Sequence, residues 1–187
     1  YTEISGQINQ RNLGLSKIDP SFSLIAFIDD DIEFTKDAVA NLIKFWNTTT
    51  ADTAGVGFNI INEELNKLSK PMFKLLTLFT STPGRVLRSG MTTPIGNVKI
   101  NCSSQWLNGG STTWRRDILE RYIHRGIDCK WSINEDLIFS YPISKNNKLY
   151  ICADAHVQHH HDNHPKNADF FFSSWKGPNN MGLSFYS

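Results

Sequence analysis

Apolar residues occur along this chain in blocks whose lengths suit strands and helices in turn. Continuous apolar runs at 22–28 (FSLIAFI) and 54–60 (AGVGFNI) predict strands covered on both faces, as in a parallel sheet. Between them, 35–46 (TKDAVANLIKFW) predicts a helix with Thr35 as its N-cap. The positions that this helix is expected to turn toward the core are Ala38, Leu42, Ile43, Phe45 and Trp46. The order strand, helix, strand indicates an α/β fold with right-handed crossovers.

The other blocks are less regular. Apolar residues at helical spacing predict a helix over 3–18, and a second helix is expected near 71–80. Proline and glycine punctuate 61–104 heavily, which otherwise indicates irregular chain or short strands. The C-terminal half is expected to hold a strand, a Gly109–Gly110 turn and a helix from about Arg115 within 102–122, a helix over 134–144 with Asn134 as N-cap, and two short strands within 148–161. Pro142 is expected to end or kink the last helix.

Composition indicates a globular, soluble chain that forms a single domain over residues 1–187. Hydrophobic residues make up 40% and charged residues 20%, and the formal net charge of +1 lacks the basic excess of nucleic-acid binding proteins. No apolar run reaches the roughly 20 residues of a membrane span, because the longest, 71–80, is interrupted by Lys74. The three scattered cysteines suit neither a disulfide framework nor a metal site, which favours a reducing, cytoplasmic environment.

Three neighbouring aspartates, Asp29, Asp30 and Asp31, follow the first expected strand. Adjacent carboxylates repel one another and are costly to desolvate. A divalent cation such as Mn²⁺ or Mg²⁺ would offset that cost and would bridge to substrate phosphates. The end of a strand is also where open α/β sheets bind ligands. The alternatives are an acidic loop that caps the next helix and a solvated acidic turn.

Glu135 and Asp136 fall in the first turn of the expected helix at 134–144. A helix N-terminus stabilises a carboxylate as the anion, and a carboxylate held in a cleft accepts a proton from a hydroxyl. The same residues also suit a purely structural role, in which they complement the helix dipole. Taken alone, the pair favours the structural role.

Two further motifs are ambiguous when each is taken alone. In the segment HVQHHHDNH (156–164), His159 and His161 share a face of a strand, and either could complete a metal site with the aspartates. Histidine clusters also occur on surfaces without a function. Gly109 and Gly110 allow the backbone to approach a ligand closely, or form a simple turn before a solvated arginine pair.

In their order along the chain, these motifs resemble the family-2 glycosyltransferases of GT-A fold. The resembling segments are QRNLGL (10–15), FIDDDIEF (27–34), WLNGGSTTWRRDILE (106–120), NEDLIFS (134–140) and ICADAHVQHH (151–160). The resemblance spans about 6–160 and leaves 161–187 unassigned. It implies a three-layer α/β/α sandwich with a mainly parallel mixed sheet. It also implies an inverting transfer of a sugar from a nucleotide-diphosphate sugar to a hydroxyl of a glycan or a lipid-linked acceptor.

The resemblance also implies a metal site. Asp29 and Asp31 carry the DxD role, in which they bind a divalent cation, Mn²⁺ or Mg²⁺, and through it the donor diphosphate. Asp30 lies beside them, near the ribose or the sugar. His159 matches a further metal ligand of some members, and His161 is the alternative.

On the acceptor side, the resemblance makes Asp136, next to Glu135, the general base that takes a proton from the acceptor hydroxyl. A single displacement inverts the anomeric centre and needs one such carboxylate, unlike the acid and base pair of a glycoside hydrolase. Arg11 matches a helix position that borders the nucleotide site. The loop that lines the donor-sugar pocket matches Asn108, Gly109 and Gly110.

Members of the family begin with a nucleotide-binding strand, loop and helix that have no counterpart after Tyr1. We therefore expect a fragment, in which the missing part pairs at an open sheet edge or in which a second copy of the chain does so. By analogy, the expected setting is polysaccharide biosynthesis in the cytoplasm or at the inner face of a membrane. Two other functions stay open, namely a non-catalytic fragment that binds nucleotide-sugar or carbohydrate, and a nucleotidyltransferase.

Overall fold

The apolar runs at 22–28 and 54–60 form strands of one mixed sheet in the computed structural model, which describes residues 7–63, 82–88, 90–122, 135–160, 175–176 and 182–183. The helices are α1 (Gln7–Lys17), α2 (Ala38–Trp46), α4 (Arg116–Tyr122) and α5 (Glu135–Ile143). The strands are β1 (Leu24–Ile28), β2 (Ile32–Phe34), β3 (Thr53–Ile60), β4 (Cys102–Ser104), β5 (Ser111–Arg115), β6 (Lys148–His159), β7 (Trp175–Lys176) and β8 (Gly182–Leu183).

The main sheet has the strand order β1-β5-β3-β6-β2, and β4 also pairs with β6. Strands β3 and β6 run parallel, whereas the other pairings described in this sheet are antiparallel. The expected mixed sheet is confirmed, but the described strands are not mainly parallel. The reason is that β5 lies between β1 and β3 and runs antiparallel to both. An apolar run reports burial and carries little information about strand direction.

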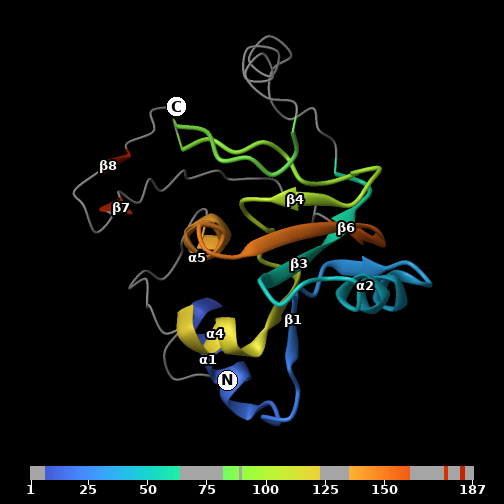
Figure 1. Cartoon of the computed structure of the whole chain (residues 1–187), viewed down its shortest axis with the longest axis horizontal. Helices are drawn as coiled ribbons and strands as arrows, with labels where there is room; N and C mark the ends of the chain where they lie inside the picture. The colour runs from blue at the N-terminus through green and yellow to red at the C-terminus, as the bar shows by residue number, and fades with distance from the viewer. Residues whose placement is uncertain are drawn as a thin grey trace.

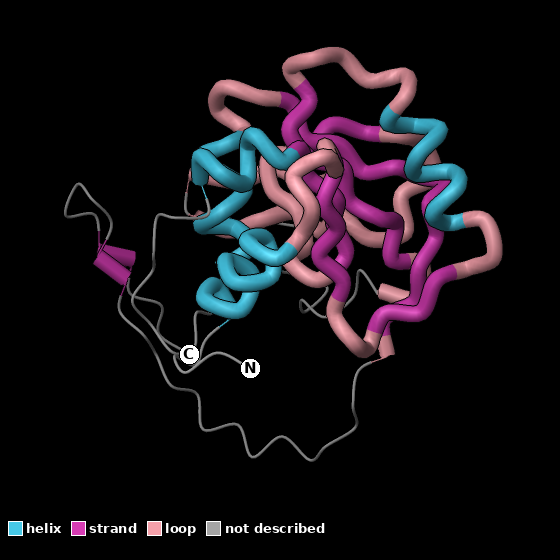
Figure 2. Tube along the Cα trace, turned by 90° about the horizontal axis from the view of Figure 1, so that it is seen from below, coloured by secondary structure: helices cyan, strands magenta, loops and turns pink. Residues whose placement is uncertain are grey.

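Helices cover both faces of this sheet, which confirms the expected three-layer α/β/α arrangement. Ile151 and Cys152 are neighbours on β6, so their side chains point to opposite faces, and they belong to separate apolar clusters. The cluster around Ile151 includes residues of α1, α4 and α5, and the cluster around Cys152 includes residues of α2. Figure 1 shows α2 apart from α1 and α4, and Figure 2 shows the strands between the two groups of helices. No helix in the described ranges is long and apolar enough to cross a membrane.

Strand β1 is less buried than its apolar run predicts. It lies at the edge of the sheet, where only Ile25 is fully buried and Leu24 and Ile28 are 38% and 37% exposed. Strand β3, in contrast, is buried along its whole length. Gly55 on β3 provides the space for the indole ring of Trp114 on β5, because a Cβ at Gly55 would lie 2.6 Å from the ring.

Strand β5 replaces the direct passage from turn to helix that the sequence predicts. Its residues STTWR are mostly polar, yet Ser111–Trp114 are buried because β5 lies inside the sheet. The Thr113 hydroxyl donates to the Val56 carbonyl at 2.9 Å and accepts from the Trp46 indole N–H at 2.8 Å. Hydrogen bonds of this kind make polar residues acceptable at a buried position.

Helix α2 begins later than predicted. Its N-cap position is Asp37 and not Thr35, whose hydroxyl donates to the His156 carbonyl of β6 at 3.0 Å. Ile43, which is expected in the core, is 52% exposed. Leu42 already faces the sheet, and the next residue of a helix lies about 100° further round the axis.

At the C-terminal end, the two expected short strands are one strand, β6. Its start pairs with β4 and its end with β2, so a single strand has two neighbours along one edge. Helix α5 ends at Ile143, directly after Pro142, as expected. Several predictions concern residues outside the described ranges, namely the start of the first helix at 3–6, the helix at 71–80, Cys129, the cap at Asn134 and His161.

Asn59 connects β3, β6 and the loop that precedes β4. This side chain is 1% exposed, and its amide donates to the carbonyls of Val98 at 2.9 Å and Ala153 at 2.8 Å. Its side-chain oxygen accepts from the Val98 N–H at 2.9 Å. The register of β3 against β6 shifts between Gly57 and Asn59, and there this amide satisfies the Ala153 carbonyl of β6 together with both backbone groups of Val98.

We therefore expect Asn59→Leu to lower the free energy of unfolding by about 3 kcal/mol or more, because it leaves three buried backbone groups without partners. Urea denaturation followed by tryptophan fluorescence measures this change. Asn47→Leu is the control, since Asn47 is exposed at the end of α2, and it should change stability by no more than about 0.5 kcal/mol. Equal effects of the two variants would contradict the role of Asn59.

Candidate active site

The three aspartates lie where β1 ends and the chain turns into β2. The Asp29 N–H donates to the Gly110 carbonyl at 2.8 Å, and Asp30 and Asp31 form the turn. The Ile32 N–H closes this turn on the Asp29 carbonyl at 3.3 Å. Strand β2 follows, so the aspartates do not cap the next helix, and that alternative is excluded.

The turn brings Asp31 against His159 at the end of β6. Ile32 pairs with His159 in the β2–β6 ladder, and the His159 Nε2 lies 2.9 Å from the Asp31 Oδ2. The other oxygen, Oδ1, is buried and has no hydrogen-bond partner in the described part of the chain. Two of the three expected metal ligands are thus together. Within the described ranges, no group of three or more His, Cys, Asp or Glu side chains is arranged to hold a metal.

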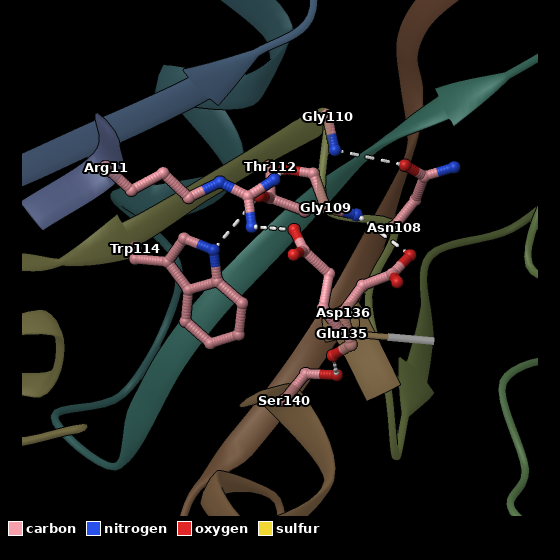
Figure 3. A network of polar contacts seen from close by, with 9 residues as sticks. All are labelled: Arg11, Asn108, Gly109, Gly110, Thr112, Trp114, Glu135, Asp136 and Ser140. Atoms are coloured by element: carbon pink, nitrogen blue, oxygen red, sulfur yellow. Dashed lines mark hydrogen bonds and ion pairs between the residues drawn. The ribbon is translucent and has the colours of Figure 1, made fainter. Parts of the chain in front are cut away.

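A loop of three residues, Asn108–Gly110, lies beside Asp136, as Figure 3 shows. The Gly109 N–H donates to the Asp136 Oδ2 at 3.2 Å, and the Gly110 N–H donates to the Asn108 side-chain oxygen at 3.1 Å. The Gly110 carbonyl accepts from Asp29, as described above. The same short segment therefore contacts both of the carboxylate-bearing parts of the chain that the sequence singled out.

Arg11 and Glu135 form an ion pair beside this loop. The Arg11 Nη1 lies 2.8 Å from the Glu135 Oε1, and the two side chains are only 18% and 11% exposed. The Arg11 Nη2 donates to the Gly109 carbonyl at 3.4 Å. The guanidinium carbon lies 5.4 Å from the centre of the Phe27 ring, which is a cation–π contact.

Burial shifts the titration of two carboxyls in this site. Burial raises the pKa of Glu135 above its ordinary value, Asp136 adds to the increase, and Arg11 opposes it. Burial likewise raises the pKa of Asp29, and the charge of Asp31 adds to the increase while Arg11 again opposes it. A cluster of partly desolvated carboxyls with shifted pKa values is typical of functional sites.

The structure adds Ser140, which the sequence analysis missed. Ser140 is 0% exposed, its Oγ accepts from the Leu107 N–H at 3.2 Å, and its hydroxyl donates to the Asp136 carbonyl. It joins the start of the loop to the first turn of α5. Its position four residues after Asp136 on a helix is the only signal in the sequence, and serine at that spacing commonly bonds back to the helix backbone.

Both arginines of the pair after the loop bind protein groups, and their side chains are 34% (Arg115) and 13% (Arg116) exposed. Arg116 donates through Nε to the Phe22 carbonyl at 2.7 Å and through Nη2 to the Asp19 carbonyl at 2.7 Å. Arg115 donates to Asp117 at 3.0 Å and to the Ala51 carbonyl. Arg116 thus fixes the chain between α1 and β1, whereas Arg115 connects the start of α4 to the turn before β3.

A model of the glycosyl transferase family 2 matches residues 2–124, which is more than half of the chain. The chain belongs to this family. As a glycosyltransferase, it uses a nucleotide-sugar as donor and transfers the sugar to an acceptor substrate. The matched residues include the aspartates and the Asn108–Gly110 loop, whereas α5 and β6 follow the matched region. A search of curated proteins found no match to the chain.

A substitution at Gly110 tests how closely this glycosyltransferase packs the Asn108–Gly110 loop against Asp29. A Cβ at Gly110 would lie 2.8 Å from the Asp29 Cβ and would overlap the carboxylate. We expect Gly110→Ala to lower the free energy of unfolding by about 1–3 kcal/mol, as overpacking does. Thermal and urea denaturation measure the change.

Gly14→Ala is the matched control. A Cβ at Gly14 meets no atom within 4 Å, and Gly14 lies in the exposed part of α1. Alanine there should stabilise the protein by up to about 1 kcal/mol through helix propensity. A neutral result for Gly110→Ala would mean that Asp29 moves aside freely.

Proposed function

We propose that the chain is the catalytic domain of a metal-dependent, inverting glycosyltransferase that transfers a sugar to a hydroxyl of a glycan or a lipid-linked acceptor in polysaccharide biosynthesis. The observation that carries the proposal is the Asn108–Gly110 loop, which contacts Asp136 through the Gly109 N–H and Asp29 through the Gly110 carbonyl. A base for the acceptor and an anchor for the donor are thereby held at a fixed separation. A displacement between two bound substrates depends on such fixed positions.

On the donor side, Asp31 and His159 suit a divalent cation, with Mn²⁺ as the first candidate. Carboxylate oxygen is a ligand of hard cations, and imidazole nitrogen is a common ligand of divalent metals. The buried Asp31 Oδ1, which has no hydrogen-bond partner within the described ranges, is the atom that a cation would satisfy. Asp29 keeps an exposed side toward which the cation, and through it a diphosphate, would bind, with Asp30 next to it. When bound, the cation neutralises the charge that develops on the leaving diphosphate.

On the acceptor side, we assign Asp136 as the general base. The Gly109 N–H fixes its Oδ2, which leaves Oδ1 to accept the proton of the acceptor hydroxyl. Glu135 is committed to Arg11 in a buried ion pair, so we assign it a structural role in the site and not proton transfer. With one base and no covalent intermediate, the transfer inverts the anomeric centre.

The metal assignment predicts that Mn²⁺ is needed for nucleotide binding. In calorimetric titrations of UDP and GDP, we expect binding to the wild-type chain only when Mn²⁺ is present. Asp31→Asn should weaken this binding at least tenfold, which is about 1.4 kcal/mol. Glu33→Gln is the control, because Glu33 lies two residues further on with a side chain that is 66% exposed. Nucleotide binding that is equally strong without Mn²⁺, or that Asp31→Asn does not weaken, would contradict the assignment of Asp31 as a metal ligand.

The base assignment predicts that Asp136→Asn lowers kcat for nucleotide release by about 10²–10⁴-fold, the usual contribution of a general base, with little change in the KM of the donor. The exposed Asp154 on β6 provides the control, Asp154→Asn, which should keep full activity. Pyrophosphate release from a nucleoside triphosphate would point instead to a nucleotidyltransferase. Intact Mn²⁺-dependent nucleotide binding without any product would identify a non-catalytic binding fragment.

A further inference from the structure

We propose that Arg11 is a positioning residue for the transfer reaction, which holds the Asn108–Gly110 loop in the conformation that orients Asp136. The inference rests on the proposed function, because it concerns the residue assigned there as the base. It gives Arg11 a different task from contact with the nucleotide.

The contacts of Arg11 come from three separate parts of the chain. Arg11 lies on α1 and reaches the Glu135 Oε1 on α5 at 2.8 Å, the Gly109 carbonyl at 3.4 Å, and the Phe27 ring on β1. Figure 3 shows the guanidinium between the loop and the first turn of α5. With a side chain that is 18% exposed, Arg11 directs its guanidinium mainly toward the protein.

Gly109 is the point at which Arg11 acts on Asp136. The Gly109 N–H donates to the Asp136 Oδ2, and the carbonyl of the same residue accepts from Arg11. Fixing both groups fixes the two backbone dihedral angles between them. A glycine has more backbone freedom than any other residue, so its conformation depends on outside contacts such as these.

The packing favours a glycine at this position. A Cβ at Gly109 would lie 3.0 Å from the Arg11 Nη2 and 3.4 Å from the Asp136 Cβ. The absence of a side chain therefore permits the close approach of Arg11 and Asp136, and it also removes the local restraint on the loop. Arg11 supplies that restraint, and Glu135 holds Arg11 in place.

The test compares Arg11→Lys with wild type in steady-state nucleotide release, using whichever of UDP-glucose, UDP-N-acetylglucosamine and GDP-mannose the wild-type chain cleaves fastest with Mn²⁺. Lysine keeps the charge but cannot contact Glu135 and Gly109 through two separate nitrogens. We expect kcat to fall about 10- to 100-fold, the effect of a small misplacement of reacting groups, with the donor KM within about threefold of wild type. Hydrogen exchange at the Gly109 amide should become faster.

Arg115→Lys is the matched control, since Arg115 also pairs with a carboxylate and a backbone carbonyl but lies outside the site. It should leave kcat unchanged. Glu135→Gln is a second test variant that keeps the Oε1 acceptor and loses the charge, and it should lower kcat at constant KM even if Arg11→Lys fails to fold.

Three results would overturn the inference in distinguishable ways. A higher donor KM at unchanged kcat in Arg11→Lys would mean that Arg11 binds the nucleotide. Wild-type kinetics in both Arg11→Lys and Glu135→Gln would mean that the loop needs no such restraint. Absence of nucleotide release by the folded wild-type chain would overturn the proposed function, and this inference with it.

Discussion

The site is shaped by the repulsion among carboxylates that the fold brings together at one end of the sheet. Burial raises the pKa values of both Asp29 and Glu135, and the charge of neighbouring carboxylates raises them further. The ionised form of each carboxyl is therefore disfavoured by the others. The protein offsets this repulsion with a different partner in each case. Glu135 has the Arg11 guanidinium, Asp136 has a glycine N–H, and Asp31 has an imidazole. Asp29 is held through its backbone N–H, and the charge of Arg11 opposes the rise in the pKa of its carboxyl.

Glu135 and Asp136 show how environment divides roles between adjacent residues of the same chemistry. The sequence pairs them in one motif and gives no reason to treat them differently. In the structure, Glu135 is 9% exposed and bound to a cation, whereas Asp136 is more exposed and bound to a neutral donor. An ion-paired and buried carboxylate is poorly suited to exchange protons with a substrate, while a partly exposed one held by a single neutral hydrogen bond keeps that capacity.

The sequence predicts best what depends on apolar periodicity and on motif order. The run at 54–60 becomes the buried strand β3, and Asp31 lies against His159, which the resemblance assigns to the same metal site. Apolar periodicity does not predict a strand whose buried residues are polar, such as β5, and it does not indicate strand direction. It also does not predict contacts between distant residues. Arg11 and Glu135 are 124 positions apart, and each suits a solvated helix position equally well.

The family match and the contacts of the structure support different parts of the site. The match ends at residue 124, so it includes the aspartates and the loop but neither α5 nor β6. Three contacts connect these later elements to the matched region, namely Gly109 with Asp136, Arg11 with Glu135 and Asp31 with His159. Each contact joins a residue inside the matched region to a candidate site residue that follows it. The case for Asp136 and His159 as parts of a glycosyltransferase site therefore depends on this geometry, because a helix or strand placed elsewhere in the fold would leave both motifs with only their structural explanations.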